Sequence, residues 1–378
     1  MTDRARRCAA LALGLALLAA PPMAAAAPSI QMSGSVYVDD WIIPGPPAGA
    51  RAPQGLTPDA AIKLGLDVHD ELTFSIKACV GCHGVEVEHA ALDYQPRSWF
   101  NVQIGRLAIP FGEYSNRVDP SGHKTASAPL IYDMGRMAYA DRASFNSGVV
   151  MLPYVDTGAL VYGQVFLGTS LQVWYAGYAV SGYKGSNDVD WVSLRSPPYV
   201  DNNDQPSYGG RLALTLGSNP GALLGDVSLG ASYTGGRYDR AAGLRYDAVG
   251  ADASIVLWKL TLRGEWALRR TRLNTAATGY PWQVVDPFFD KSGFYLEVEH
   301  PLGKYLELVY RYDRLDRKGV PLPGSSAQMT PDARLERATA GLVLTPAAAV
   351  YVKLSYEYWK PSLVPAFHSG HLGLGGAF

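Results

Sequence analysis

The chain has 378 residues, with 33 basic and 34 acidic side chains and a formal net charge of −1 at pH 7. This even balance, without any run of basic residues, excludes the electrostatic footprint of a nucleic-acid-binding protein. Glycine and tyrosine are abundant, at 40 and 23 residues, and long helical patterns are absent, which favours a chain built of strands.

Residues 1–26 have the pattern of a secretory signal peptide. A basic start, Arg4 to Arg7, precedes an apolar stretch, Cys8 to Ala20, and small residues that offer cleavage sites follow at Met23 to Ala27. The apolar stretch is too short to cross a bilayer, and no run of about eighteen apolar residues follows it. We therefore expect residues 1–26 to be removed on export, and residues 27–378 to cross a membrane only by strands.

Two early strands are predicted around residues 72–81 and 84–94. In LTFSIKAC the side chains alternate, so that Phe74 and Ile76 share one face and Lys77 and Cys79 the other. In a membrane barrel the apolar face meets lipid and the polar face meets the lumen. The alternation therefore predicts that Cys79 points into the lumen.

The turn between these strands carries a motif with chemistry of its own. Cys79, Cys82 and His83 have the C-x-x-C-H spacing that attaches a c-type haem, in which two thioethers hold the porphyrin and the imidazole binds iron. Export supports this interpretation, because covalent attachment takes place beyond the inner membrane. The motif predicts one covalent haem c, with Cys79, Cys82 and His83 as its binding residues and His83 on the iron.

Three simpler interpretations of the cysteines remain open. Cys79 and Cys82 could form a disulfide in the oxidising compartment, could bind zinc, or could stay free. A sixth haem ligand would have to come from elsewhere in the chain. The candidates for it are His69, His89, His123, Met134 and Met137.

A long segment, residues 115–146, follows the strand that ends in IPFGEY. It contains His123, Met134 and Met137 and shows no strand period. We expect this loop to fold into the lumen and narrow it.

The carboxy-terminal half has the clearest alternation. In VYVKLSYEYW, Leu354 and Tyr356 fall on one face while Lys353 and Glu357 fall on the other, and the segments around residues 260, 293 and 306 repeat the pattern. The predicted inward charges mix both signs, so strong selection of anions or cations is not expected. They are Arg263, Glu265, Arg269, Glu297, Glu299, Glu307, Arg311, Lys353 and Glu357.

A soluble sandwich would alternate in the same way. The barrel is favoured by strands near the roughly ten residues of a tilted membrane strand, and by short turns that alternate with long polar loops. Aromatic residues near those loops suit a girdle at the membrane interface. These residues are Tyr280, Trp282, Phe288, Phe289 and Trp359.

The last residues, HLGLGGAF, place Leu372, Leu374 and the terminal Phe378 at alternate positions, which resembles the carboxy-terminal signal of bacterial outer-membrane barrels. Counting segments predicts an all-β fold, a transmembrane antiparallel barrel of about sixteen strands, within 14 to 18. An even count puts both termini in the periplasm. The predicted location is the outer membrane of a Gram-negative bacterium, with its lipid as a partner.

The segment FNVQIGRLAIPFGEY, after VEVEHAALDYQPRSW, resembles the early hairpin of the phosphate-selective porin O and P type. That resemblance implies a trimeric diffusion channel. With Cys79, Cys82 and His83 added, the chain is similar to the monohaem cytochrome and porin fusions of iron-oxidising bacteria. This second likeness implies electron transfer at the outer membrane.

The leading hypothesis from the sequence is therefore an electron-transfer porin with one haem and a periplasmic electron carrier as partner. The alternative is a general diffusion porin for small solutes or ions, in which Cys79 and Cys82 staple a hairpin. No phosphate-binding glycine loop and no Ser, His and Asp triad is evident, so a carrier or channel is favoured over an enzyme.

Overall fold

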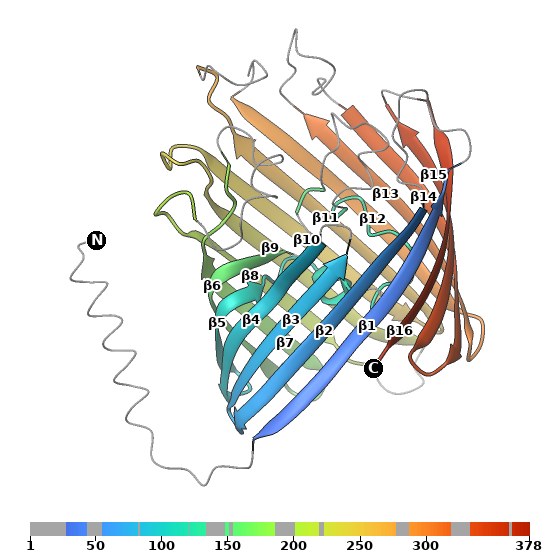
Figure 1. The fold of residues 1–378 in the computed structure, drawn as a ribbon, viewed down its shortest axis with the longest axis horizontal. Coiled ribbons are helices and arrows are strands. Elements are labelled where there is room, and N and C mark those ends of the chain that lie inside the picture. The colour runs from blue at the N-terminus through green and yellow to red at the C-terminus, as the bar shows by residue number, and fades with distance from the viewer. Residues whose placement is uncertain are drawn as a thin grey trace, which may run out of the picture.

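The computed structural model is a closed antiparallel barrel of sixteen strands, in which each strand pairs with its neighbours in sequence and β1 pairs with β16 (Figure 1). It describes residues 28–43, 55–81, 84–119, 121–133, 148–150, 154–185, 201–218, 223–276, 287–318, 333–362 and 365–378. The predicted signal peptide, residues 1–26, lies outside these ranges. The barrel confirms the predicted fold class and strand count.

The strands match the sixteen segments expected from the sequence. They are β1 Ser29–Ile42, β2 Gly55–His69, β3 Leu72–Gly81, β4 Gly84–Arg97, β5 Phe100–Ala108, β6 Val155–Leu167, β7 Leu171–Val180, β8 Ser207–Leu216, β9 Leu224–Arg237, β10 Arg245–Leu257, β11 Leu260–Arg272, β12 Phe288–Pro301, β13 Leu306–Lys318, β14 Ala333–Ala347, β15 Val350–Pro361 and β16 Phe367–Ala377. The short 3-10 turn η1, Tyr114–Arg117, lies between β5 and β6. Among the described residues, no helix has the length and apolar character needed to span a membrane.

The strand faces separate by polarity as the alternation predicts. Large apolar side chains such as Phe74, Ile76, Leu354 and Tyr356 are exposed on the outer face, where lipid would cover them. The lumen side holds buried charged and polar groups. All nine predicted inward charges lie on this side. Each of these side chains is either buried or forms an ion pair with another lumen group.

Two of the aromatic residues assigned to an interfacial girdle are instead inside the barrel. Phe289 and Trp359 are 3% and 1% exposed. Phe289 contacts the cationic groups of Lys291 and Arg317, and Trp359 stacks on Phe367. The girdle prediction is wrong for these two residues because each occupies an inward position of its strand. Tyr280 and Trp282 lie outside the described residues.

The barrel closes at its first and last strands. Gly34 of β1 exchanges two backbone hydrogen bonds with Phe378, at 3.0 and 2.9 Å. Leu372, Leu374 and Phe378 all point outward, as the carboxy-terminal pattern predicts. A Cβ atom on Gly34 would lie 2.6 Å from the Ala61 carbonyl oxygen and 2.7 Å from the Phe378 ring, so only glycine fits at this seam.

The crowding at Gly34 predicts that Gly34→Ala destabilises the closed barrel by about 1–3 kcal/mol, the usual cost of overpacking. The matched control is Gly370→Ala on β16, where an added Cβ meets nothing within 4 Å. The measurement is the temperature at which the folded band is lost on a heat-modifiable gel. Equal transition temperatures for the two variants would contradict this account of the seam.

Candidate functional site

The lumen contains the described part of the loop between β5 and β6, residues 109–119, 121–133 and 148–150, which we call the lumen loop (Figure 1). It turns inward at Pro110, Phe111 and Gly112. Gly112 has φ +70°, and a Cβ there would collide with Tyr132 and Glu265, so the turn requires glycine. The buried Phe111 ring fits against Gly250 of β10, which has no side chain to displace it. The predicted inward fold is confirmed for residues 115–119 and 121–133, and the rest of the predicted segment, including Met134 and Met137, lies outside the described residues.

The first anchor of the lumen loop is Glu265 of β11, which is 4% exposed. Its carboxylate accepts hydrogen bonds from the Tyr114 backbone N–H at 2.6 Å, the Tyr132 hydroxyl at 2.5 Å and the Tyr295 hydroxyl at 2.8 Å. Burial raises the pKa of both loop tyrosines, Tyr114 and Tyr132, so each hydroxyl keeps its proton. One buried carboxylate thus ties together the two arms of the loop.

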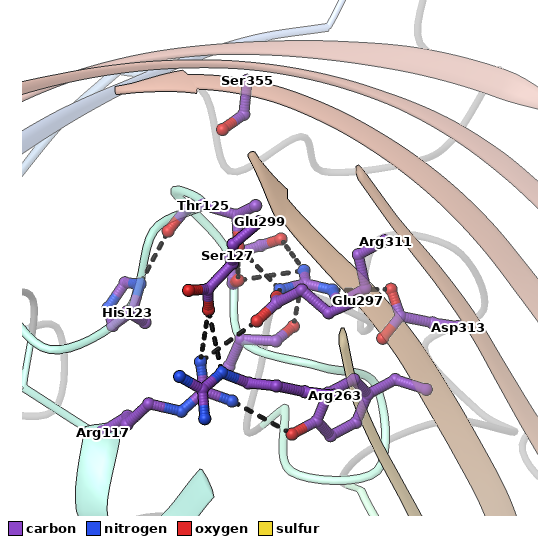
Figure 2. A network of polar contacts seen from close by, with 12 residues as sticks. Arg117, His123, Thr125, Ser127, Arg263, Glu297, Glu299, Arg311, Asp313 and Ser355 are labelled. Carbon is purple, nitrogen blue, oxygen red and sulfur yellow. Dashed lines mark hydrogen bonds and ion pairs between the residues drawn. The ribbon is translucent and has the colours of Figure 1, made fainter. Parts of the chain in front are cut away.

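The second anchor is Arg117, at the end of η1. Its guanidinium donates to Glu297 at 3.0 Å, Glu299 at 3.3 Å and the Tyr295 hydroxyl at 3.2 Å, as Figure 2 shows. Arg263 of β11 also bonds Glu299, at 3.0 Å. Burial opposes the charge on Arg117, but the surrounding oxygens outweigh it and raise the pKa of the guanidinium.

The third anchor holds the returning arm of the loop, residues 123–130, on β13 to β15. Arg311 donates to the Thr125 hydroxyl at 2.6 Å and to the Ser127 carbonyl at 3.0 Å, and its Nε bonds Asp313 at 3.0 Å. Asp313 in turn accepts the Leu130 backbone N–H at 3.0 Å. Further bonds from the strands to this arm come from Arg337, Lys353, Ser355 and Glu357.

The loop also reaches the opposite wall. Asp119 forms an ion pair with Lys77 of β3, and Lys77 is shared with Glu88 of β4 at 2.8 Å. In a closed barrel of sixteen strands, β3 lies eight positions from β11, where Glu265 anchors the same loop. The lumen loop therefore crosses the full width of the barrel, with Asp119 at its far edge.

A cavity of about 510 Å³ lies on one side of this crossing. Residues 109–119 of the lumen loop bound it on one side, and the inward faces of β3 to β9 bound it on the other. Its lining includes Lys77, Glu88, Gln103, Trp174 and Arg211. The cavity therefore lies between the lumen loop and the wall of β3 to β9.

The charged groups of the cavity lining are paired. Lys77 binds Glu88 and Asp119, and Arg211 holds Asp252 of β10 through both guanidinium nitrogens, at 2.5 and 2.9 Å. Glu113 is bound by Arg117 at 3.1 Å and by Arg263 at 3.3 Å. Paired charges give a weak net field, which agrees with the sequence expectation of little ion selectivity.

The described part of the C-x-x-C-H motif is Cys79. It lies on β3, makes no disulfide with another described residue, and its thiol hydrogen-bonds to the inward Glu88, so the predicted lumen orientation is correct. Gly81 pairs with Gly84 across the hairpin, and Cys82 and His83, between them, lie outside the described residues. An inward Cys79 fits an attached haem, whereas the charged lining beside it differs from the apolar shell that a haem face needs.

The candidate sixth ligands are scattered. His123 is buried in the lumen loop with Nδ1 2.6 Å from the Thr125 carbonyl oxygen, and His89 of β4 pairs with the Ser75 hydroxyl at 2.8 Å. His69 is bonded at the β2–β3 turn, by the Glu71 N–H. Met134 and Met137 lie outside the described residues. Within the described ranges, no group of three His, Cys, Asp or Glu side chains is arranged to hold a metal ion.

Several lumen residues escaped the sequence interpretation, namely Arg117, Asp119, Asp93 and Trp174. Arg117 and Asp119 sit in a loop without any period, so only the fold shows what they contact. Asp93 and Trp174 could have been found from strand parity. Asp93 is two steps along β4 from Ala91, and Trp174 shares the inward face of β7 with the buried Ala176 and Tyr178.

Comparisons with known proteins show the same barrel at low sequence identity. No family model matches the chain, and neither does any curated protein. An anion-selective porin from Comamonas acidovorans aligns with a TM-score of 0.57 at 12% identity, over 93% of this chain and 100% of that one. The trimer form of OmpT from Vibrio cholerae has a TM-score of 0.54 at 10% identity, over 93% and 100%.

OmpF of Salmonella typhi aligns with a TM-score of 0.54 at 12% identity, over 92% of this chain and 97% of that one. These likenesses show the fold, which is the sixteen-stranded barrel of outer-membrane porins. The predicted location in the outer membrane of a Gram-negative bacterium agrees with this fold.

The anchoring of the lumen loop yields a prediction at Arg311. Arg311→Ala leaves Asp313 and Glu297 without this partner, and breaking a buried pair of this kind costs about 3–5 kcal/mol. We expect the loop to loosen, giving noisy single-channel currents and faster cleavage by an added protease. Arg334→Ala, at an exposed pair with Asp316 on the outer face, is the control. Quiet currents in the Arg311 variant would show that the loop does not depend on this anchor.

Proposed function

We propose that this chain is a general diffusion porin, a channel through which small solutes cross the outer membrane. The observation that carries the proposal is the lumen loop. It is fixed across the barrel and leaves a cavity of about 510 Å³ along one side. A loop that is only a plug would need no such space beside it. The neighbour from Comamonas acidovorans, which is named as a porin, supports the same role.

Selectivity for phosphate, implied by the early resemblance, is not part of this proposal. Recognition of an anion requires cations that are free to bind it. The two cations that line the cavity, Lys77 and Arg211, are each held by carboxylates. We infer a channel that passes ions of either sign and neutral solutes.

A trimer is part of the proposal, because one neighbour, OmpT of Vibrio cholerae, is described in a trimer form. Sedimentation of the detergent-solubilised protein tests it, with a complex of three protomers expected. A single protomer would rule it out.

The channel proposal is tested by single-channel recording in a planar bilayer. We expect stable conductance in KCl, with nearly equal permeability to cation and anion. Asp119→Asn removes the ion pair at the far edge of the lumen loop, so its conductance should rise. Because Asp119 is part-exposed, this pair contributes only about 0.2–1 kcal/mol to stability.

The control for that variant is Asp70→Asn, an exposed change in the turn between β2 and β3, which should leave the current unchanged. Absence of any conductance from folded wild-type protein would refute the channel. A rise in conductance in both variants would refute the role of the Lys77–Asp119 pair in narrowing the space beside the lumen loop.

The C-x-x-C-H motif carries the second candidate function, an electron-transfer barrel with one covalent haem c and a periplasmic electron carrier. The inward Cys79 supports it. Cys79, Cys82 and His83 would hold the group, and a bound haem would supply one-electron chemistry at the lumen wall.

Expression in a host with haem-attachment machinery tests whether Cys79 and Cys82 carry a covalent haem. A pyridine haemochrome spectrum that survives denaturation in wild-type protein, and is lost in Cys79→Ser, is the result expected of the haem candidate. A colourless wild-type protein would eliminate it and leave the diffusion porin. A mass lower by two hydrogens in that colourless protein would then identify a disulfide.

A further inference from the structure

The cavity beside the lumen loop has two chemically different ends. The end at the loop holds the paired charges Lys77, Glu88, Glu113 and Asp119. The other end, toward the short turns of the barrel, is lined by neutral groups. These are Gln103 of β5, Tyr162 of β6, Trp174 of β7, Thr215 of β8 and Ser228 of β9, which we call the neutral patch.

Asp93 of β4 sets the orientation of the neutral patch. It is 7% exposed and accepts hydrogen bonds from the Gln103 amide at 2.8 Å and from the Tyr162 hydroxyl at 3.0 Å, with a third from Gln95 at 2.6 Å. No cation pairs with Asp93 within the described chain. Since a carboxylate only accepts, it fixes the Gln103 NH₂ toward itself and leaves the amide oxygen to other donors.

The aromatic members of the patch are adjacent. In the β6–β7 register Tyr162 pairs with Ala176 and Gln164 with Trp174, so Tyr162 and Trp174 are diagonal neighbours on the inward face. Both rings are half-buried and both line the cavity. Within the described residues, the Trp174 indole N–H has no protein acceptor. A large aromatic surface therefore borders the cavity, beside an indole donor that no described protein group accepts.

The lumen loop contributes the opposite wall. Asn116 is exposed, lines the same cavity, and its side-chain amide makes no hydrogen bond to another described residue. The space between Asn116 and the patch thus offers amide donors and acceptors, an indole donor and two ring faces. The charges nearby are already neutralised by each other, so they do not concentrate free ions.

We propose that the neutral patch is a binding subsite for a small neutral polyhydroxylated solute, a monosaccharide or a polyol. Its C–H face would lie on the Trp174 and Tyr162 rings, and its hydroxyls would bond Gln103, Asn116, Thr215 and Ser228. This inference rests on the proposed channel and names its substrate class. A charged solute of the same size meets no unpaired counter-charge, so placing its charge in the cavity is not compensated.

The test is single-channel recording in KCl with D-glucose added. We expect the current to fall saturably with glucose concentration, beyond the fall in bulk conductivity. Gluconate, which is charged, and a polyethylene glycol of similar size should give no saturation. Trp174→Ala should raise the half-blocking glucose concentration about two- to tenfold, the range that the loss of one aromatic contact gives.

Asp93→Asn serves as the second variant, because it keeps the size of the side chain. Its amide group can donate as well as accept, so Gln103 and Tyr162 lose their fixed orientation, and glucose block should weaken while KCl conductance is retained. The matched control is Trp258→Ala, an exposed residue in the turn between β10 and β11, which should leave the block unchanged.

The outcomes separate this inference from the channel proposal. If folded protein gives no current in KCl, the channel proposal is refuted. A normal KCl current with no saturable glucose effect, or an effect that is the same in Trp174→Ala, overturns only the subsite. Saturable block by a zwitterion such as glycine betaine in place of glucose would also overturn the stated substrate class.

Discussion

A strand that crosses a bilayer cannot leave its backbone N–H and C=O groups unpaired, since lipid offers no partner for them. In this chain the constraint is met by closing the sheet between β1 and β16, with Gly34 and Phe378 bonded to each other at the seam. Closure of the barrel then determines which way the side chains face. Alternate side chains must face lipid or lumen, so the lumen becomes a polar surface that can hold a loop by ion pairs and hydrogen bonds.

The bonds that hold the lumen loop are distributed unevenly around the barrel wall. Many bonds join it to β11 through β15, where Glu265, Arg311 and Asp313 are fully enclosed. The ion pair between Lys77 and Asp119 joins it to β3 on the wall opposite β11. The loop is thus fixed along one half of the barrel, and its far edge borders the half in which the cavity lies. The part-exposed pair of Lys77 and Asp119 borders the cavity, whereas the enclosed bonds that hold the loop lie on β11 to β15.

Much of the fold follows from the sequence because the strand period reports the environment directly. The alternation of Lys353 and Glu357 with Leu354 and Tyr356 assigns both faces of β15 correctly, and Cys79 on β3 is placed inward by the same rule. Phe289 and Trp359 depart from the girdle expectation because strand parity turns both side chains inward, whatever their aromatic character and closeness to a loop. The contacts of Arg117 and Asp119 could not be predicted, since a loop without a period carries no register. Cys82 and His83 lie outside the described residues, so their assignment as haem-binding residues stays a prediction.

The most direct test of the central claim, that solutes pass beside the lumen loop along β3 to β9, uses the native thiol next to that path. Single-channel current is recorded from the Cys82→Ser protein before and after a bulky, membrane-impermeant thiol reagent, with labelling of Cys79 checked by mass spectrometry. The account predicts a stepwise fall in conductance on labelling, absent in a protein that also carries Cys79→Ser. An unchanged current through channels whose Cys79 is fully labelled would contradict it.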